Sequence, residues 1–255
     1  MNTITTQNIV NYLDSTYLKT PEQSGLTEEQ TWEKVKQLCD EAIENHFFAV
    51  MIRPNYVKKV KDYFSNLEGF IPKIGTVISF HEGKKSIEEK LFEAQQAIND
   101  GADELDYVIN YNEFINGNLA LIEEELIKGS ALAIKNGKIA KWIIEIAALN
   151  DAQIADISEL ISTTITQNFP QKDWQKIFIK SSTGFFLTEN GKPNGATFPA
   201  IQIMLEHGKP LPVKAAGGVK NFDDAKRMVE LGVQRIGTSA AKDIASNTEN
   251  SSISY

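Results

Sequence analysis

Two lysines stand at the ends of short apolar segments, where a charged amine is costly. Lys180 follows the apolar residues 177–179 and precedes Ser-Ser-Thr-Gly, and Lys214 lies in the segment VKAAGGV. Moving an ammonium group out of water is unfavourable, and a second positive charge nearby lowers its pKa further. A lysine that is neutral near pH 7 can form a Schiff base with a carbonyl compound. The alternative is that each amine reaches past the apolar segment into solvent, but two such lysines on neighbouring strands favour chemistry.

Three carboxylates lie in segments of the same kind. Asp106 is flanked by Leu, Tyr and Val in ELDYVIN, where an unpaired charge is rarely buried. An Asp–Lys pair can move protons in general acid–base catalysis, and the alternative is a salt bridge that only supports the strand. Asp14 in YLDSTYL and Glu145 in WIIEIAAL are expected to orient the lysines.

Glycine-rich turns follow the last three strand segments and suggest an anion site. The sequences STG, AAGGV and GTS occur there, and glycine lets backbone N–H groups approach a phosphate at the start of a helix. These could also be ordinary turn glycines, but three of them beside two lysines favour a phosphorylated substrate. The candidate substrate- or phosphate-binding residues are Thr16, Thr183, Gly184, Gly217, Gly218, Gly237 and Ser239.

The elements that carry these residues recur in one order, a helix followed by a short apolar strand. The expected strands cover residues 12–16, 47–53, 73–80, 104–110, 141–147, 176–182, 211–215 and 234–238. The middle strands are continuously apolar, which is typical of a parallel sheet covered on both faces. Eight such units predict an α/β protein with a (β/α)8 TIM barrel, whose chemistry sits at the C-terminal ends of the strands. The alternative is an open doubly wound sheet, which the lack of a dinucleotide-binding glycine motif disfavours.

Helix boundaries can be assigned from capping residues. Ser86 and Glu89 have the spacing of a capping box, and Gly101 is suited to end that helix. Thr27 and Asn221 are expected to cap two further helices.

Composition limits the possible partners and location. The chain of 255 residues has a formal net charge of −8, and such an acidic protein repels nucleic acids and anionic membranes. Its one cysteine, Cys39, allows no disulfide within the chain, no residue spacing suggests a metal site, and no secretory signal is recognised. We expect a cytoplasmic protein whose residues 1–255 form a single barrel domain, with a flexible polar tail over residues 245–255.

The motifs quoted above occur in an order and spacing that resemble the deoxyribose-phosphate aldolase family, together with LDSTYLK, from about Asn11 to Ala241. The resemblance implies that Lys180 forms the Schiff base, that Lys214 lowers its pKa and relays protons, and that Asp106 is the acid–base partner. It further implies phosphate binding by Gly184, Gly217, Gly218 and Ser239. The implied reaction cleaves 2-deoxy-D-ribose 5-phosphate reversibly into acetaldehyde and D-glyceraldehyde 3-phosphate without a metal or other cofactor, during deoxynucleoside breakdown. Relatives are often homodimers.

Several positions depart from the family pattern. Ser15 stands where many members have histidine, Met51 where many have cysteine, and Ala240 where some have a second serine. The loop after Gly184 is longer than in many members. Because it borders the expected phosphate site, substrate preference is the property that this difference concerns. The final residue, Tyr255, could bring its phenol to the site, or it could lie in an unstructured end.

Two other functions fit part of this pattern. A phosphosugar isomerase or synthase could use the same glycine turns, but it would not need both lysines. A non-catalytic phosphosugar-binding protein would tolerate the loss of Lys180. The combination of Lys180, Lys214 and Asp106 favours the aldolase.

Overall fold

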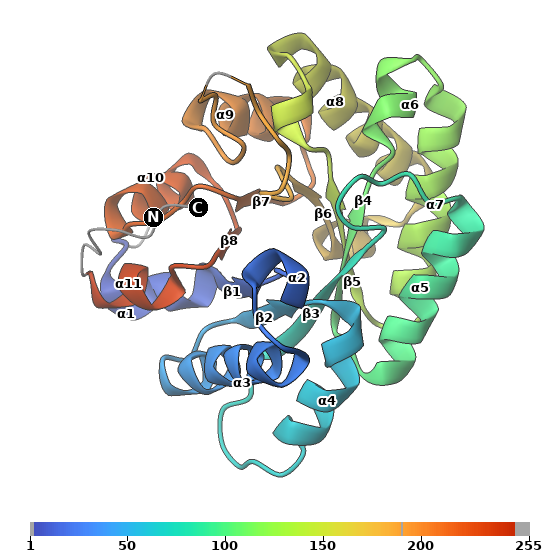
Figure 1. Ribbon diagram of the computed structural model, residues 1–255. Helices are drawn as coiled ribbons and strands as arrows, with labels where there is room; N and C mark the ends of the chain where they lie inside the picture. Colours follow the sequence, from blue (N-terminus) through green and yellow to red (C-terminus); the bar gives the residue numbers. More distant parts are fainter. Residues whose placement is uncertain (1–2, 190, 248–255) are drawn as a thin grey trace.

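The computed structural model describes residues 3–189 and 191–247, and eight parallel strands form its centre. Each strand pairs with the next, and the first pairs with the last, as in Leu13 opposite Ile236. Figure 1 shows the strands as a central ring with the helices around it. The strands are β1 (Leu13–Tyr17), β2 (Ala49–Ile52), β3 (Lys73–Ile78), β4 (Glu104–Val108), β5 (Ile139–Ile143), β6 (Ile177–Lys180), β7 (Val213–Ala216) and β8 (Arg235–Thr238). The predicted (β/α)8 barrel is confirmed, and the open doubly wound sheet is excluded.

Helices connect the strands and cover the outside of the barrel. They are α1 (Thr6–Ile9), α2 (Pro21–Ser24), α3 (Glu28–Glu44), α4 (Pro54–Phe64), α5 (Ile87–Asp100), α6 (Tyr111–Ile115), α7 (Leu119–Lys135), α8 (Asp151–Asn168), α9 (Phe198–His207), α10 (Phe222–Leu231) and α11 (Ala241–Ser246). Three 3-10 turns supplement them, namely η1 (Val10–Tyr12), η2 (Ile146–Ala148) and η3 (Gln171–Lys176). Within the part of the chain that the structure describes, no helix is both long and apolar enough to cross a membrane.

The expected capping residues fix the helix ends. Ser86 caps α5 in a capping box with Glu89, and Gly101 ends the helix at φ 107°. A residue with a side chain is strained in that left-handed conformation, so glycine suits the position. Thr27 and Asn221 cap α3 and α10 as expected.

The main apolar core lies between the strands and the helices. A representative contact is the stack of Tyr107 on Trp142, with ring centroids 4.7 Å apart. Gly129 in α7 permits it, because a Cβ there would lie 2.8 Å from the Trp142 ring. Cys39 is buried in this core. Burial of these large rings contributes much of the stabilisation of the barrel wall.

Two sequence-based boundaries need correction, and the ends of the other strands differ from the expected ones by at most two residues. The fifth strand was expected over residues 141–147, but β5 ends at Ile143, so Glu145 lies after the strand. The polar tail was expected from residue 245, but Ala245 and Ser246 belong to α11. Tyr255 lies outside the described residues.

Candidate active site

Asp106 is the centre of a buried ion-pair network inside the barrel. Its Oδ1 accepts a hydrogen bond of 2.6 Å from Lys141. Its Oδ2 accepts one from Lys180 and one from Lys214, each of 2.9 Å. The Asp106, Lys141 and Lys214 side chains are fully buried, and Lys180 is 4% exposed. Two lysines therefore share one carboxylate oxygen, and the structure brings together Lys180, Lys214 and Asp106, the three residues that the sequence singled out.

Strand register explains why these side chains meet. Asp106 in β4 lies opposite Lys141 in β5, and Lys180 in β6 lies opposite Lys214 in β7. Residues paired in this way on parallel strands project to the same side of the sheet. In a closed barrel that side is the interior, so four charged groups share a small enclosed volume.

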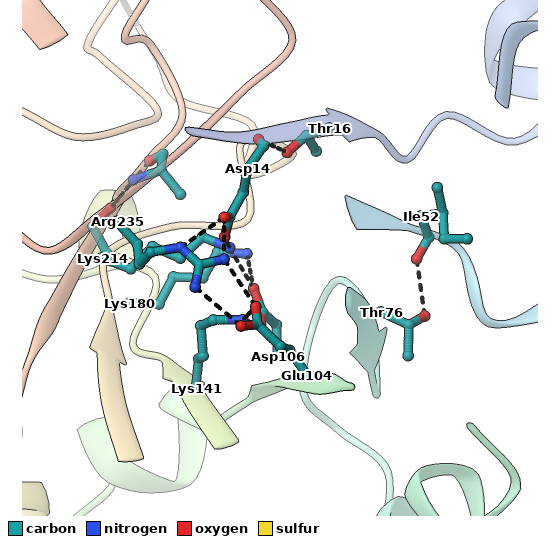
Figure 2. A network of polar contacts seen from close by, with 12 residues as sticks. Asp14, Thr16, Ile52, Thr76, Glu104, Asp106, Lys141, Lys180, Lys214 and Arg235 are labelled. Carbon is teal, nitrogen blue, oxygen red and sulfur yellow. Dashed lines mark hydrogen bonds and ion pairs between the residues drawn. The ribbon is translucent and has the colours of Figure 1, made fainter. Parts of the chain in front are cut away.

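A second set of ion pairs lies beside this centre. Lys214 contacts Oδ2 of Asp14 at 2.6 Å, and Lys141 contacts Oε2 of Glu104 at 2.7 Å. Arg235 pairs with Glu104 at 3.0 Å and also with Asp14. Figure 2 shows Lys141, Lys180, Lys214 and Arg235 converging on Asp14, Glu104 and Asp106. The expectation that Asp14 orients a lysine agrees with its contact to Lys214.

The charges of this network do not balance when every group is ionised. Its cations are Lys141, Lys180, Lys214 and Arg235, and its carboxylates are Asp14, Glu104 and Asp106. An uncompensated charge is costly in a buried site. Loss of one lysine proton makes the network neutral, so the structure favours one uncharged lysine.

Lys180 is the group best suited to lose that proton. Burial lowers the pKa of Lys180 to about 8, with Lys214 and Lys141 acting in the same direction and Asp106 opposing them. Burial alone would also lower the pKa of Lys141, but Asp106, Glu104 and Asp14 raise it above its ordinary value. Lys141 therefore stays charged while Lys180 can become a nucleophile near neutral pH.

Asp106 is ionised at physiological pH when no substrate is bound. Burial alone would raise its pKa, but Lys141, Lys180 and Lys214 outweigh burial and hold the pKa well below its ordinary value. The same balance lowers the pKa of Asp14 to about 2, chiefly through Arg235 and Lys214 against burial. Both groups can accept hydrogen bonds from lysine at any physiological pH.

The sequence suggested that Glu145 orients a lysine. Its side chain instead accepts hydrogen bonds from Thr183. Its Oε2 accepts hydrogen bonds from the Thr183 backbone N–H at 3.2 Å and from the Thr183 hydroxyl. The reason is local backbone geometry, since Glu145 adopts φ 56° just after β5 ends. Burial raises the pKa of Glu145 to about 7. Glu145 thus fixes the Ser-Thr-Gly turn after β6.

Two of the expected glycine turns lie against each other. A Cβ on Gly217 would meet Gly184 Cα at 3.5 Å and Gly195 Cα at 2.9 Å. Gly184, Gly217 and Gly218 all have φ between 78° and 81°, a region that glycine adopts without strain. The loops after β6 and β7 therefore approach closely only because glycine occupies them. The close contact of Gly195 with Gly217 was not predicted from the sequence, because the two residues are distant in the chain.

The remaining expected binding residues take different positions. Gly237 was grouped with the phosphate turns, but it lies beside the Lys214 side chain, where a Cβ would be 3.1 Å from Lys214 Cε. Thr16 donates a hydrogen bond of 2.9 Å to the backbone oxygen of Asp14. Ser239 is exposed in the turn after β8. Gly237 therefore makes room for Lys214, and its role at the phosphate stays a prediction.

Three members of the network were not identified from the sequence, namely Glu104, Lys141 and Arg235. A signal was available, because Glu104 and Asp106 are two residues apart in one strand and must face the same side. Two inward acids in one strand require cations on its neighbours. Within residues 3–189 and 191–247, no group of three or more His, Cys, Asp or Glu side chains is arranged to hold a metal ion.

Comparison with known proteins agrees with this fold and shows the family. A family model described as DeoC/LacD family aldolase matches residues 12–118. A deoxyribose-phosphate aldolase from Caldicellulosiruptor saccharolyticus is 35% identical, over 95% of this chain and 99% of the relative. One from Clostridioides difficile is 38% identical, over 91% of this chain and 96% of the relative. The solved deoxyribose phosphate aldolase of Aeropyrum pernix, described as tetrameric, is 26% identical with a TM-score of 0.76, over 95% of this chain and 91% of that structure.

These findings identify the class of protein as a barrel aldolase, which is a lyase. The chain belongs to the deoxyribose-phosphate aldolase family.

Proposed function

We propose that this enzyme cleaves 2-deoxy-D-ribose 5-phosphate reversibly into acetaldehyde and D-glyceraldehyde 3-phosphate through a Schiff base on Lys180. The observation that supports it most is the shared contact of Lys180 and Lys214 with Asp106, inside a network that is neutral when one lysine loses its proton. The named relatives add support for the substrate.

The chemistry follows from the neutral amine. Lys180 Nζ attacks the C1 aldehyde carbon, and loss of water gives a protonated imine. A base removes the proton from the C3 hydroxyl, the C2–C3 bond breaks, and its electron pair moves into an enamine on C1 and C2. D-glyceraldehyde 3-phosphate leaves, C2 takes up a proton, and water releases acetaldehyde from Lys180.

Asp106 and Lys214 are assigned the proton transfers. Lys214 Nζ lies 2.9 Å from Asp106 Oδ2, and Lys180 Nζ lies 2.9 Å from the same oxygen. General acid–base catalysis by such a positioned pair contributes roughly 10²- to 10⁴-fold to a rate. The protonated imine keeps a positive charge at Lys180, which Asp106 stabilises in turn.

The phosphate is assigned to the turns of Gly184, Gly217 and Gly218 and to Ser239. Their left-handed backbones suit close approach of an anion to N–H groups. Thr183, held by Glu145, shapes the first of these turns. This leaves the aldehyde end of the substrate at Lys180.

A direct activity assay tests this proposal. Purified protein is mixed with 2-deoxy-D-ribose 5-phosphate, and both products are measured by coupled reduction with NADH. We expect turnover in the wild type and none above background in Lys180→Met, which keeps the apolar stem. Turnover that survives in Lys180→Met would overturn the assigned nucleophile.

Assembly and location are part of the proposal. We assign a homodimer, as the family resemblance implies, although the Aeropyrum pernix relative is described as tetrameric. Light scattering after size-exclusion chromatography distinguishes 28.4 kDa for one chain from its multiples. The cytoplasmic location and the role in deoxynucleoside breakdown stay predictions of the same resemblance.

A further inference from the structure

Phe185 lies on the loop after β6, yet its ring packs on the opposite side of the barrel. Its centroid is 5.0 Å from the ring of Phe80 and 5.9 Å from that of His81, both just after β3. The Arg53 guanidinium, just after β2, lies 6.0 Å away. In the closed strand order, three strands separate β6 from β2 in either direction. Phe185 therefore spans the mouth of the barrel.

The ring covers an apolar group that is separate from the main core. Leu18, Met51 and Val77 form this group, and Phe80 and Phe185 pack against it. Val77 is paired in register with Asp106, so both side chains face the interior. The mouth thus has a charged half around Asp106 and an apolar half beside it. The Phe185 ring covers the apolar half.

A short chain of hydrogen bonds holds the start of this loop. The Phe185 N–H donates to Thr183 Oγ1 at 3.0 Å, and the Thr183 hydroxyl and N–H donate to Glu145. Glu145 is itself fixed, because Ile144 N–H donates to the oxygen of Lys180 and Ile146 N–H to that of Ser181, each at 3.0 Å. The buried carboxyl group of Glu145 thus connects the β5–β6 backbone to the position of Phe185.

We propose that Phe185 is a specificity-determining residue that limits the size of the donor aldehyde, and that Glu145 is its positioning residue. This rests on the proposed function. There, C1 of the substrate is bound to Lys180 and the phosphate lies at the glycine turns. C2 then lies on the path from C1 to the phosphate, so a donor side chain on C2 projects to one side of that path, and we place it in the apolar half of the mouth.

The size limit follows from packing. Acetaldehyde has no side chain on C2, whereas propanal must place a methyl group and butanal an ethyl group beneath the Phe185 ring. One methylene in an apolar pocket changes discrimination roughly 10- to 200-fold. Truncation of the ring should admit the longer donors.

The experiment measures aldol addition of acetaldehyde, propanal and butanal to D-glyceraldehyde 3-phosphate. For Phe185→Ala we expect the ratio of kcat/KM for butanal to that for acetaldehyde to rise at least about tenfold. Phe186→Ala is the matched control, because Phe186 is the next residue but packs toward Tyr111, with centroids 6.2 Å apart. Its ratio should equal that of the wild type.

Glu145 is tested by the same ratio. Glu145→Ala removes the acceptor of both Thr183 hydrogen bonds, so its ratio should rise in the direction of Phe185→Ala. Glu145→Gln keeps an acceptor oxygen and should restore the wild-type ratio. A merely structural role would lower activity with all three aldehydes equally and leave the ratio unchanged.

Several outcomes would overturn the inference. One is an unchanged ratio in Phe185→Ala with acetaldehyde addition intact, and another is an equal rise in Phe186→Ala. If thermal melting shows that Phe185→Ala is unfolded, Phe185→Leu decides, since its narrower side chain should raise the ratio to a smaller extent. A wild type that adds no acetaldehyde at all would instead overturn the proposed function, and this inference with it.

Discussion

Replacing Lys214 by methionine should make Lys180 a poorer nucleophile by raising its pKa. Both amine nitrogens lie 2.9 Å from the same oxygen of Asp106, so they are at most about 5.8 Å apart. At an effective dielectric constant of about 20, two unit charges at that distance repel by about 3 kcal/mol. That energy corresponds to about two pKa units. The pKa of Lys180, now about 8, should rise to about 10.

The expected rate change follows from the neutral fraction of the amine. At pH 7 about one amine in ten is neutral when the pKa is about 8, and about one in a thousand when it is about 10. Only the neutral form attacks, so Schiff-base formation at pH 7 should slow about 100-fold. The rate should recover as the pH rises through the new pKa.

The assay is the rate at which acetaldehyde and cyanoborohydride modify Lys180, measured by mass spectrometry from pH 6 to 10.5. It reports Schiff-base formation and does not depend on the later proton transfers. The matched control is Lys90→Met, which removes another buried ammonium group, one that pairs with Glu125 outside the network. The midpoint of the pH–rate curve of Lys90→Met should stay near pH 8. A midpoint for Lys214→Met that is unchanged or lower would refute the electrostatic reasoning.

Three further predictions concern other parts of the molecule. Asp106→Asn keeps the side-chain volume but removes the charge that three lysines share, so turnover should fall at least about 100-fold, and an assay near wild-type level would contradict its role. Gly217→Ala would put a Cβ 2.9 Å from Gly195 Cα, at a residue with φ 81°. The KM for 2-deoxyribose 5-phosphate should therefore rise more than the KM for 2-deoxyribose. An equal rise of the two KM values would argue against a phosphate-binding turn. Lys90→Met leaves Glu125 buried without the ammonium group that lies 2.6 Å from it. The free energy of unfolding, measured in urea, should fall by about 3 kcal/mol. Lys128→Met is the control, because its partner Glu124 is exposed, and it should change the free energy of unfolding little.

Much of the barrel could be predicted because its signals are local. Apolar runs marked the middle strands, and caps such as Ser86 and Gly101 marked helix ends. Lys180, Lys214 and Asp106 stood out because each interrupts an apolar segment. The wall of a (β/α)8 barrel repeats one local unit eight times, so local patterns determine most of its architecture.

The parts that were missed depend on contacts between distant residues. Arg235 begins β8 and gave no sign that it would pair with Glu104. Glu145 was expected to orient the lysines, but its positive φ turns it toward Thr183. A positive φ at a residue other than glycine has no signal in the sequence. Phe185 directly follows the Ser-Thr-Gly turn in the sequence, but its ring packs on residues that follow β2 and β3. Only the closed barrel brings such groups together.

The central claim is that Lys180 forms the Schiff base, and reductive trapping tests it most directly. The protein is mixed with 2-deoxy-D-ribose 5-phosphate, reduced with borohydride, digested and mapped by mass spectrometry. We expect a reduced adduct on Lys180 in the wild type and no adduct at Lys141 or Lys214. An adduct on another lysine, or none in folded protein that turns over substrate, would contradict it.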